Sequence, residues 1–475
     1  MVVSLRLPYS AFNDVYPQRE THMTLRIGAG AGFAGDRIDP ARDLAERGAL
    51  DYLAFECLAE RTLAYGHLQR MADPAKGFHL LIEKRLGAVL AACVANRTTI
   101  ITNMGVANPR GAGLAALALA KRMGLKINIA VVEGDDVTAH INPQTHLPEI
   151  SKTVAEHGLR VVGANAYLGV EAILPALDLQ PHLVITGRVA DPSLFLAPLV
   201  HRYGWKLDDW QHLGAGTAIG HLLECTTQVT GGYFADPPYK VVPNIAHLGF
   251  PLAEVEPDGS GIITKLQGTG GLVSVLTVKE QLLYEVHNPA AYLTPDVTAD
   301  FSQARVTQAG ADRVQIANAT GSQRPEKLKA IVGFDGGFLA EAEFSYAGLG
   351  AVARCQIAAD IVEERMRVIH HCKEPLRLDM IGVSALHASA TRVAQPAQTA
   401  QSAQSAQTED VRLRAALRTP SRDMAENLLQ EVESLWLSGP AGGGGYRGVI
   451  TPAVSTQAIF VNRNLINIKV EILQS

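Results

Sequence analysis

The chain has 475 residues, of which 47% are hydrophobic and 19% charged, with a formal net charge of −5 at pH 7. A chain of this size can bury a large core and should form two or more domains. The charge balance and the lack of a Lys/Arg cluster exclude an extended nucleic-acid surface. The longest apolar runs fall far short of the roughly 20 residues that a membrane span needs.

The five cysteines are an odd number without Cys-x-x-Cys spacing, which argues against a disulfide framework and a zinc ribbon. Residues 1–23 carry no secretory signal pattern, and we expect them to form a loose extension. These features together favour a reduced, cytoplasmic protein that contacts neither nucleic acid nor a membrane.

The first apolar run leads into a glycine-rich segment at Gly28–Gly35. Gly30, Gly32 and Gly35 match the Gly-x-Gly-x-x-Gly pattern of dinucleotide-binding folds, placed after a strand. Asp36 and Pro40 interrupt the helix that should begin at the third glycine. A tight loop at the end of a strand is therefore favoured over an NAD(P) site.

A second strand–loop–helix pattern begins at the β-branched run Thr98–Thr102. Free backbone N–H groups and the positive end of the following helix would make an anion site. The candidate phosphate-binding residues here are Gly105, Asn108, Arg110 and Gly111. The alternative is that glycine and alanine let this helix pack closely on a sheet.

Strands and helices alternate through residues 24–200 at the spacing of β-α-β units, which predicts a mostly parallel sheet with helices on both faces. In such α/β folds, ligands bind beyond the carboxyl ends of the strands. Thr102-Asn103, Glu133–Asp136 and Thr186–Arg188 lie at such ends, so we expect them to converge. Asp191 follows where either a helix N-cap or a site carboxylate would fit.

A helix expected at residues 217–229 places His221, Glu224 and Cys225 on one face. Acid–base use of His221 and Glu224 and a purely structural cluster both remain open. The spacing also suits a metal, but the ligand set is too small to name one, and we predict none. The candidate catalytic residues are Glu224, His221, Arg188, Asp191 and Asp236.

The chain then predicts a hairpin at Glu254–Lys265, turning at Asp258-Gly259. A second glycine turn precedes a helical segment and is another possible anion-binding helix start. Its candidate residues are Gly268, Thr269, Gly270 and Gly271.

From Lys327 onward the pattern changes, which divides the chain into domains at residues 24–326 and 327–475. A hairpin about Asp335–Gly337, helices at 350–369 and 421–437, and further strands give the order β-α-β-β-α-β, a C-terminal ferredoxin-like α+β domain. The Gln/Ala-rich residues 394–408 should form a disordered insertion. The glycine run Gly442–Gly445 fits either a plain loop or a segment that closes over a ligand.

Several long segments carry a family resemblance: GFAGDR, TNMGVANPRGAG, ITGRVADPSLFLAPLVHRYGW, GHLLECTTQVTGGYFADPPYK, KLQGTGG, TVKEQLLYEVHNPAAYLTPDV and GPAGGGG. Together they resemble the acyclic terpene utilisation protein A (AtuA-like) family, named after bacterial gene clusters for citronellol and geraniol breakdown. Those clusters also encode a geranyl-CoA carboxylase and acyl-CoA enzymes. The resemblance implies an acyl-CoA or branched carboxylate ligand and assigns no catalytic residue.

We therefore expect a cytoplasmic enzyme with acid–base hydratase, lyase or isomerase chemistry on an acyl-CoA or branched acid. Glu224 would be the acid or base with His221 as its partner, Arg188 the clamp for a carboxylate or thioester, and Asp191 or Asp236 an orienting group. Coenzyme A would enter as part of the substrate, with its phosphates on the glycine turns.

The alternative is a non-catalytic binding subunit associated with acyl-CoA carboxylase components. A ferredoxin-like terminal domain with a free sheet face would offer the surface for such an association. In either case we expect a homo-oligomer.

Overall fold

The structure is a computed structural model that describes residues 24–386 and 410–474. These residues form two compact units: the first runs to Gly333 and resumes at Thr456, and the second is Phe334–Ser455. The predicted boundary at residue 327 is close to this division. The return of the chain end to the first unit was not predicted. The expected N-terminal extension and the insertion at 394–408 lie outside the described residues.

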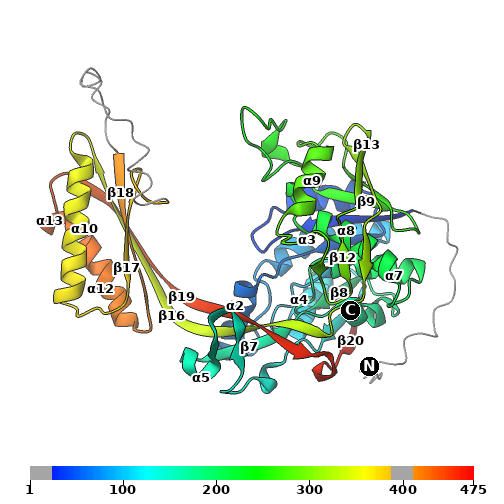
Figure 1. The fold of residues 1–475 in the computed structure, drawn as a ribbon, viewed down its shortest axis with the longest axis horizontal. Helices are drawn as coiled ribbons and strands as arrows, with labels where there is room; N and C mark the ends of the chain where they lie inside the picture. Colours follow the sequence, from blue (N-terminus) through cyan, green and yellow to red (C-terminus); the bar gives the residue numbers. More distant parts are fainter. Residues whose placement is uncertain (1–23, 387–409, 475) are drawn as a thin grey trace. The chain divides into compact units, whose positions relative to one another are not determined.

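A large central sheet organises the first unit (Figure 1). Within the described residues its ten strands follow the order β13 (Arg305–Gly310), β14 (Arg313–Ala317), β10 (Gly261–Lys265), β9 (Pro251–Val255), β1 (Leu25–Ala31), β2 (Tyr52–Phe55), β3 (Thr99–Thr102), β8 (Leu183–Thr186), β4 (Asn128–Glu133) and β20 (Lys469–Gln474). The central strands β1, β2, β3, β8 and β4 are parallel. Antiparallel strands extend both edges.

Two groups of helices pack on this sheet, which confirms the predicted α/β class. One group consists of α1 (Asp39–Arg47), α3 (Ile82–Asn96) and α4 (Pro109–Arg122), and the other of α6 (Val170–Leu177), α7 (Ser193–Tyr203) and α8 (Trp210–Glu224). The parallel strands are buried almost without interruption, because both of their faces are covered. Among the described helices, none is both long and apolar enough to cross a membrane.

A small antiparallel sheet covers α8. It consists of β11 (Tyr292–Leu293), β12 (Thr298–Asp300) and β15 (Thr320–Ser322). Gly214 of α8 makes the close approach possible, since a Cβ atom there would lie 2.0 Å from the carbonyl oxygen of Thr320. This contact fixes the position of the segment around Tyr292 relative to α8.

Two segments differ from the predictions. Within the alternating region 24–200, β7 (Val161–Ala166) forms a strand, but it pairs with β16 (Lys327–Ala347) instead of joining the central sheet. The hairpin expected about Asp335–Gly337 is absent, because β16 continues through these residues. Gly337 has φ +77°, so the glycines allow an irregularity within one long strand rather than a reversal.

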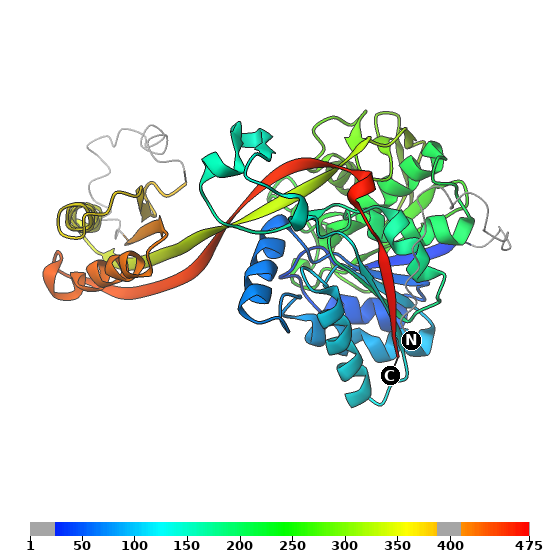
Figure 2. The same ribbon diagram turned by 90° about the horizontal axis from the view of Figure 1, so that it is seen from below.

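The end of the chain, red in Figure 2, belongs to the first unit. Its strand β20 pairs antiparallel with β4 at the edge of the central sheet, with Val470 opposite Val132. Sequence reasoning had placed this strand in the second domain. The partner strand lies more than three hundred residues earlier, so nothing local in the sequence indicated the pairing.

In the described part of the second unit the order is β16, α10 (Ala351–Val368), β17 (Leu376–Ile381), β18 (Asp410–Thr419), α12 (Arg422–Glu433), α13 (Leu435–Ser438) and β19 (Gly443–Asn462). The strands form a sheet in the order β17-β18-β16-β19. Helices α10 and α12 pack on each other and on β18 (Figure 1). Part of the glycine run begins β19, where a Cβ atom on Gly443 would lie 2.3 Å from the ring of Phe344. Close packing therefore explains this glycine.

Candidate functional site

Polar groups from the carboxyl ends of four parallel strands meet at one edge of the central sheet. Asp135, after β4, accepts hydrogen bonds from the backbone N–H of Arg188 at 2.7 Å and from the side chain of Asn165 at 2.8 Å. Asn103, after β3, donates to Glu56, after β2, at 3.0 Å. The predicted convergence of these segments is confirmed. Burial raises the pKa of Glu56 to about 8, so this carboxyl is protonated at neutral pH.

Arg188, which follows β8, is at the centre of this region with only 1% of its surface exposed. Its guanidinium donates hydrogen bonds to the carbonyl oxygens of Leu58 and Val189 and to the carboxylate of Asp191. It also lies 4.5 Å from the centre of the Tyr167 ring. Burial is the largest single influence and lowers the pKa of Arg188, but Asp191, Tyr167, Glu56 and Glu60 together outweigh it and raise that pKa. The guanidinium is thus occupied by the chain itself, which does not fit its predicted role as a free clamp.

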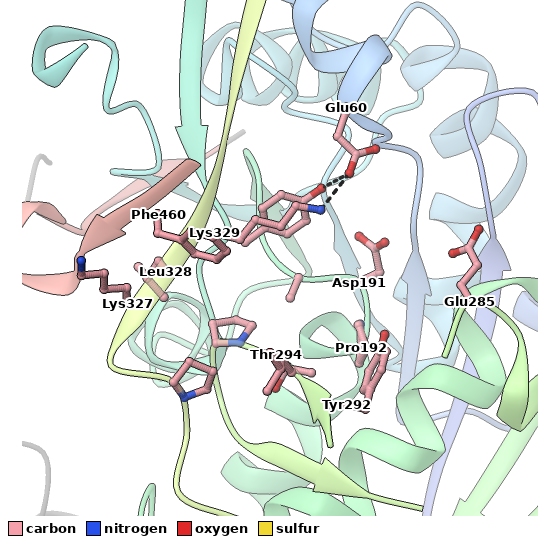
Figure 3. A pocket seen from close by; sticks show the side chains of 15 residues that line it. Glu60, Asp191, Pro192, Glu285, Tyr292, Thr294, Lys327, Leu328, Lys329 and Phe460 are labelled. Atoms are coloured by element: carbon pink, nitrogen blue, oxygen red, sulfur yellow. Dashed lines mark hydrogen bonds and ion pairs between the residues drawn. The ribbon is translucent and has the colours of Figure 1, made fainter. Parts of the chain in front are cut away.

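A cavity of about 430 Å³ opens beside Asp191 (Figure 3). Its wall combines apolar side chains with three carboxyls, two lysines and two tyrosines. The lining residues are Glu60, Tyr167, Ala190, Asp191, Pro192, Glu285, Tyr292, Leu293, Thr294, Pro295, Pro325, Lys327, Leu328, Lys329 and Phe460. In Figure 3, Asp191 and Glu285 lie on one side of the cavity, and Lys327 and Phe460 lie on the other. A ligand would therefore meet acidic groups at one end and a cation at the other.

The pKa values of two carboxyls in the cavity are shifted in opposite directions. The hydroxyl of Tyr167 donates to Glu60 at 2.6 Å, and the ammonium of Lys329 lies 3.4 Å from the same oxygen. Burial works against ionisation of Glu60, but these two partners lower its pKa. Burial raises the pKa of Asp191, and Arg188 only partly opposes this. One cavity thus contains one carboxyl with a lowered pKa and one with a raised pKa.

His221 and Glu224 form a buried pair on α8, with His221 Nδ1 at 2.7 Å from Glu224 Oε1. Burial lowers the pKa of His221 to about 4. Burial and the nearby Asp191 and Glu285 raise the pKa of Glu224 well above its usual value. Burial therefore disfavours the charged form of both groups.

Neither member of this pair is among the residues that line the cavity. The pair adjoins it through Tyr292, whose ring centre is 5.1 Å from that of His221. The other ring nitrogen of His221, Nε2, and the other carboxyl oxygen of Glu224, Oε2, are buried without a hydrogen-bond partner in the described structure. The predicted catalytic pair thus lies behind the cavity wall.

Asp236 is the one predicted catalytic residue that lies apart from this group. It is exposed and forms a tight turn with Lys240, through backbone hydrogen bonds of 2.8 and 2.9 Å. It does not line the cavity. A role in orienting a bound group has no support from this placement.

The loop before α4 uses its donors within the chain. The N–H of Gly105 donates to the last carbonyl of β8 at 3.1 Å, and the N–H of Gly111 donates to the Asn108 side chain at 3.0 Å. Arg110 forms an ion pair with Glu471 of β20 at 3.0 Å. In this conformation these donors hold the loop and helix in place, so few remain for a phosphate.

The second glycine turn is similar. The N–H groups of Gly270 and Gly271 donate to the carbonyls of His247 and Pro243, both at 2.8 Å, and the N–H of Thr269 bonds within the turn. Gly268 and Gly271 have positive φ, and a Cβ atom on Gly270 would lie 2.1 Å from a neighbouring carbonyl oxygen. Close packing on backbone accounts for Gly270 and Gly271, and the positive φ accounts for Gly268.

Close packing also explains a glycine in the first glycine-rich segment, Gly28–Gly35. Helix α1 begins at Asp39, after the third glycine, as Asp36 and Pro40 had indicated. A Cβ atom on Gly32 would lie 2.8 Å from the backbone of Cys225 at the end of α8. In the described part of the chain, no group of three or more His, Cys, Asp or Glu residues could hold a metal ion.

Sequence reasoning missed much of the cavity wall. The missed polar residues are Glu60, Tyr167, Glu285, Tyr292, Thr294, Lys327 and Lys329. Glu285 and Tyr292 stand within one of the long family motifs, which was a usable signal. Glu60 and Lys329 are 269 residues apart in the sequence, and no local pattern connects them.

The fold and the cavity define an α/β protein with an acid-lined cavity beyond the carboxyl ends of parallel strands. Residues 25–472 match the family described as acyclic terpene utilisation family protein AtuA, and the chain belongs to this family. Membership suggests involvement in the use of acyclic terpenes. No curated protein and no solved structure matched the chain.

Proposed function

We propose that this chain is an enzyme of acyclic terpene and branched acyl-CoA breakdown that moves a proton at a carbon next to a carbonyl group. Hydration, elimination and isomerisation of unsaturated acids all use such a step. The observation that carries the proposal is the pair of oppositely shifted carboxyls in one cavity, Asp191 and Glu60. Carboxyls whose pKa values are shifted apart in one site are an arrangement that acid–base catalysis uses.

The cavity supports the proposed ligand class. Its volume falls within the range of about 300–1,000 Å³ typical of small-molecule sites. Pro192, Leu293, Pro295, Leu328 and Phe460 supply apolar surface for a branched hydrocarbon chain. The two lysines of the wall suit the negative charge of a carboxylate or of a coenzyme A moiety that extends from the mouth. Coenzyme A is part of the substrate in this proposal.

Asp191 is the proposed proton-transfer group, since it lines the cavity and its raised pKa makes its ionised form a stronger base. Arg188 fixes its orientation from behind through a hydrogen bond. Glu224 and His221 act one layer further back, where Glu224 contributes to the raised pKa of Tyr292. From the sequence, Asp191 was expected to orient a bound group; here it is proposed to transfer the proton itself.

The test is a ligand screen followed by turnover. Thermal-shift measurements with acyclic branched acids and their coenzyme A thioesters identify a ligand, and product analysis then identifies the reaction. Asp191→Asn should keep ligand binding and abolish turnover, and Glu224→Gln should reduce turnover while the circular dichroism spectrum stays unchanged. Full turnover by Asp191→Asn would overturn the assignment.

A binding subunit for an acyl-CoA carboxylase is a second candidate. We propose that the second unit is ferredoxin-like, which is supported by its β-α-β-β-α-β order and by the strand order β17-β18-β16-β19. Co-purification with carboxylase subunits that persists in Glu224→Gln, together with no turnover of any ligand, would favour this candidate.

A cytoplasmic location and a homo-oligomeric state complete the proposal. All five cysteines of the chain are free, which suits a reducing compartment. Light scattering of the purified protein would test the oligomeric state.

A further inference from the structure

Two tyrosines line the same cavity, and their hydroxyl groups differ. The Tyr167 hydroxyl is engaged, because it donates to Glu60 at 2.6 Å. The Tyr292 hydroxyl forms no hydrogen bond within the described structure, although its ring contacts two neighbours. In Figure 3 the oxygen of Tyr292 points toward the side of the cavity that carries Asp191 and Glu285. This hydroxyl is therefore directed at the space where a ligand would lie.

The ring of Tyr292 is held in place from several sides. Its centre is 5.1 Å from the ring of His221 and 5.4 Å from that of Phe301, and His221 and Phe301 also stack on each other. Its backbone pairs with Ala299 in the small sheet that covers α8. The hydroxyl is thus placed by packing before a ligand arrives, which is what an effective hydrogen-bond donor in a site requires.

Tyr292 acts as a donor and not as a base. Burial raises its pKa strongly, and the carboxyls of Glu224, Asp191 and Glu285 raise it further, so the phenol stays protonated. Asp191 and Glu285, which also line the cavity, are carboxyls and act as hydrogen-bond acceptors when ionised. An oxygen atom of a ligand that enters this end would find its hydrogen-bond donor in Tyr292.

We infer that Tyr292 donates a hydrogen bond to the carbonyl oxygen of the bound ligand and stabilises the negative charge that forms there. In the reaction, ionised Asp191 takes the proton from the carbon next to the carbonyl. The electron pair of the broken C–H bond forms a C=C bond, and the carbonyl oxygen becomes an enolate oxygen. Tyr292 keeps its proton and only shares it with that oxygen. This inference rests on the proposed function.

The experiment compares a branched unsaturated methyl ketone with the hydrocarbon in which C=O is replaced by C=CH₂. Thermal-shift titration gives the affinity of each for the full chain. The wild-type protein should prefer the ketone by about tenfold, as expected for one net hydrogen bond. Tyr292→Phe keeps the ring and its stacking, and it should bind the two ligands equally. Circular dichroism and the melting temperature establish that the variant is folded.

Tyr167→Phe is the matched comparison, because it removes a hydroxyl from the same cavity that already has a partner. It should retain the preference for the ketone, whatever its effect on overall affinity. A preference that survives in Tyr292→Phe would overturn the inference and leave the proposed function standing. Failure of the wild-type protein to bind the ketone, although a branched acid or its coenzyme A thioester binds, would overturn the inference alone. Failure to bind any of these ligands would overturn the proposed ligand class, and the inference with it.

Discussion

The buried guanidinium of Arg188 donates a hydrogen bond to Asp191, three residues further along the chain. Arg188 has 1% of its side chain exposed and Asp191 has 39%, so the cation is inside the fold and the carboxyl faces outward. A cavity-lining carboxyl is thereby oriented by a charge that a ligand does not reach. Stability and the proposed reactivity both depend on this pair.

Removing the cation should cost much of the stability of the first unit. Arg188→Met leaves Asp191 and two backbone carbonyls without their donor, so unfolding should become easier by about 3–5 kcal/mol. Asp191→Asn retains a side-chain oxygen that can accept from Arg188 but removes the charge that offsets the buried cation, so it should cost stability, though less than Arg188→Met. Urea denaturation measures both. Equal stability of Arg188→Met and the wild type would contradict this reading of the pair.

His221 should make the protein sensitive to acid. Burial lowers its pKa from 6.5 to about 4 in the folded state, so the unfolded chain binds a proton more readily between these values. Stability contributed by the neutral imidazole is present above pH 6.5 and is lost as pH falls toward 4, by roughly 3 kcal/mol. His221→Gln has no imidazole to protonate, so its free energy of unfolding should fall less than that of the wild type between pH 6.5 and pH 4. Parallel acid titrations of the two proteins, followed by circular dichroism, test this.

Asp296 should have the opposite effect with pH. It accepts hydrogen bonds from the N–H of Val170 at 2.7 Å and the hydroxyl of Ser193 at 2.5 Å. Burial and the neighbouring Glu171 raise its pKa from 3.8 to about 7, so the folded protein holds a proton that the unfolded chain releases. Stability is therefore lost as pH rises from about 4 to 7.

Asp296→Asn remains neutral at every pH. Its melting temperature relative to the wild type should climb between pH 4 and 7 and then level off. A constant difference across this range would show that Asp296 does not titrate there.

Two helix glycines provide a matched test of packing. A Cβ atom on Gly214 of α8 would lie 2.0 Å from a backbone oxygen of β15, whereas one on Gly87 of α3 would meet nothing within 4 Å. Gly214→Ala should destabilise the protein by about 1–3 kcal/mol, because backbone must move. Gly87→Ala should stabilise it by about 0.5–1 kcal/mol through higher helix propensity. Thermal melts of the pair suffice, and equal shifts would contradict the packing argument.

Local patterns predicted much of the first unit. The apolar periodicity of residues 24–200 correctly gave most of its strands and helices, and Asp258-Gly259 gave the hairpin of β9 and β10. The polar ends of β2, β3, β4 and β8 converge as expected, because parallel strands in one sheet end at the same edge. Such features depend on residues close in the sequence and on a rule of sheet geometry.

The sequence by itself determined the α/β class, the family and the presence of Arg188, Asp191, His221 and Glu224 near one another. Only the tertiary structure decided which of them line the cavity, and it placed Asp191 in the wall and the His221–Glu224 pair behind it. It also brought Glu60 and Lys329 together. The spacing of residues along a helix determines which side chains share a face. Which other parts of the chain contact that face depends on burial and on pairing between strands far apart in the sequence.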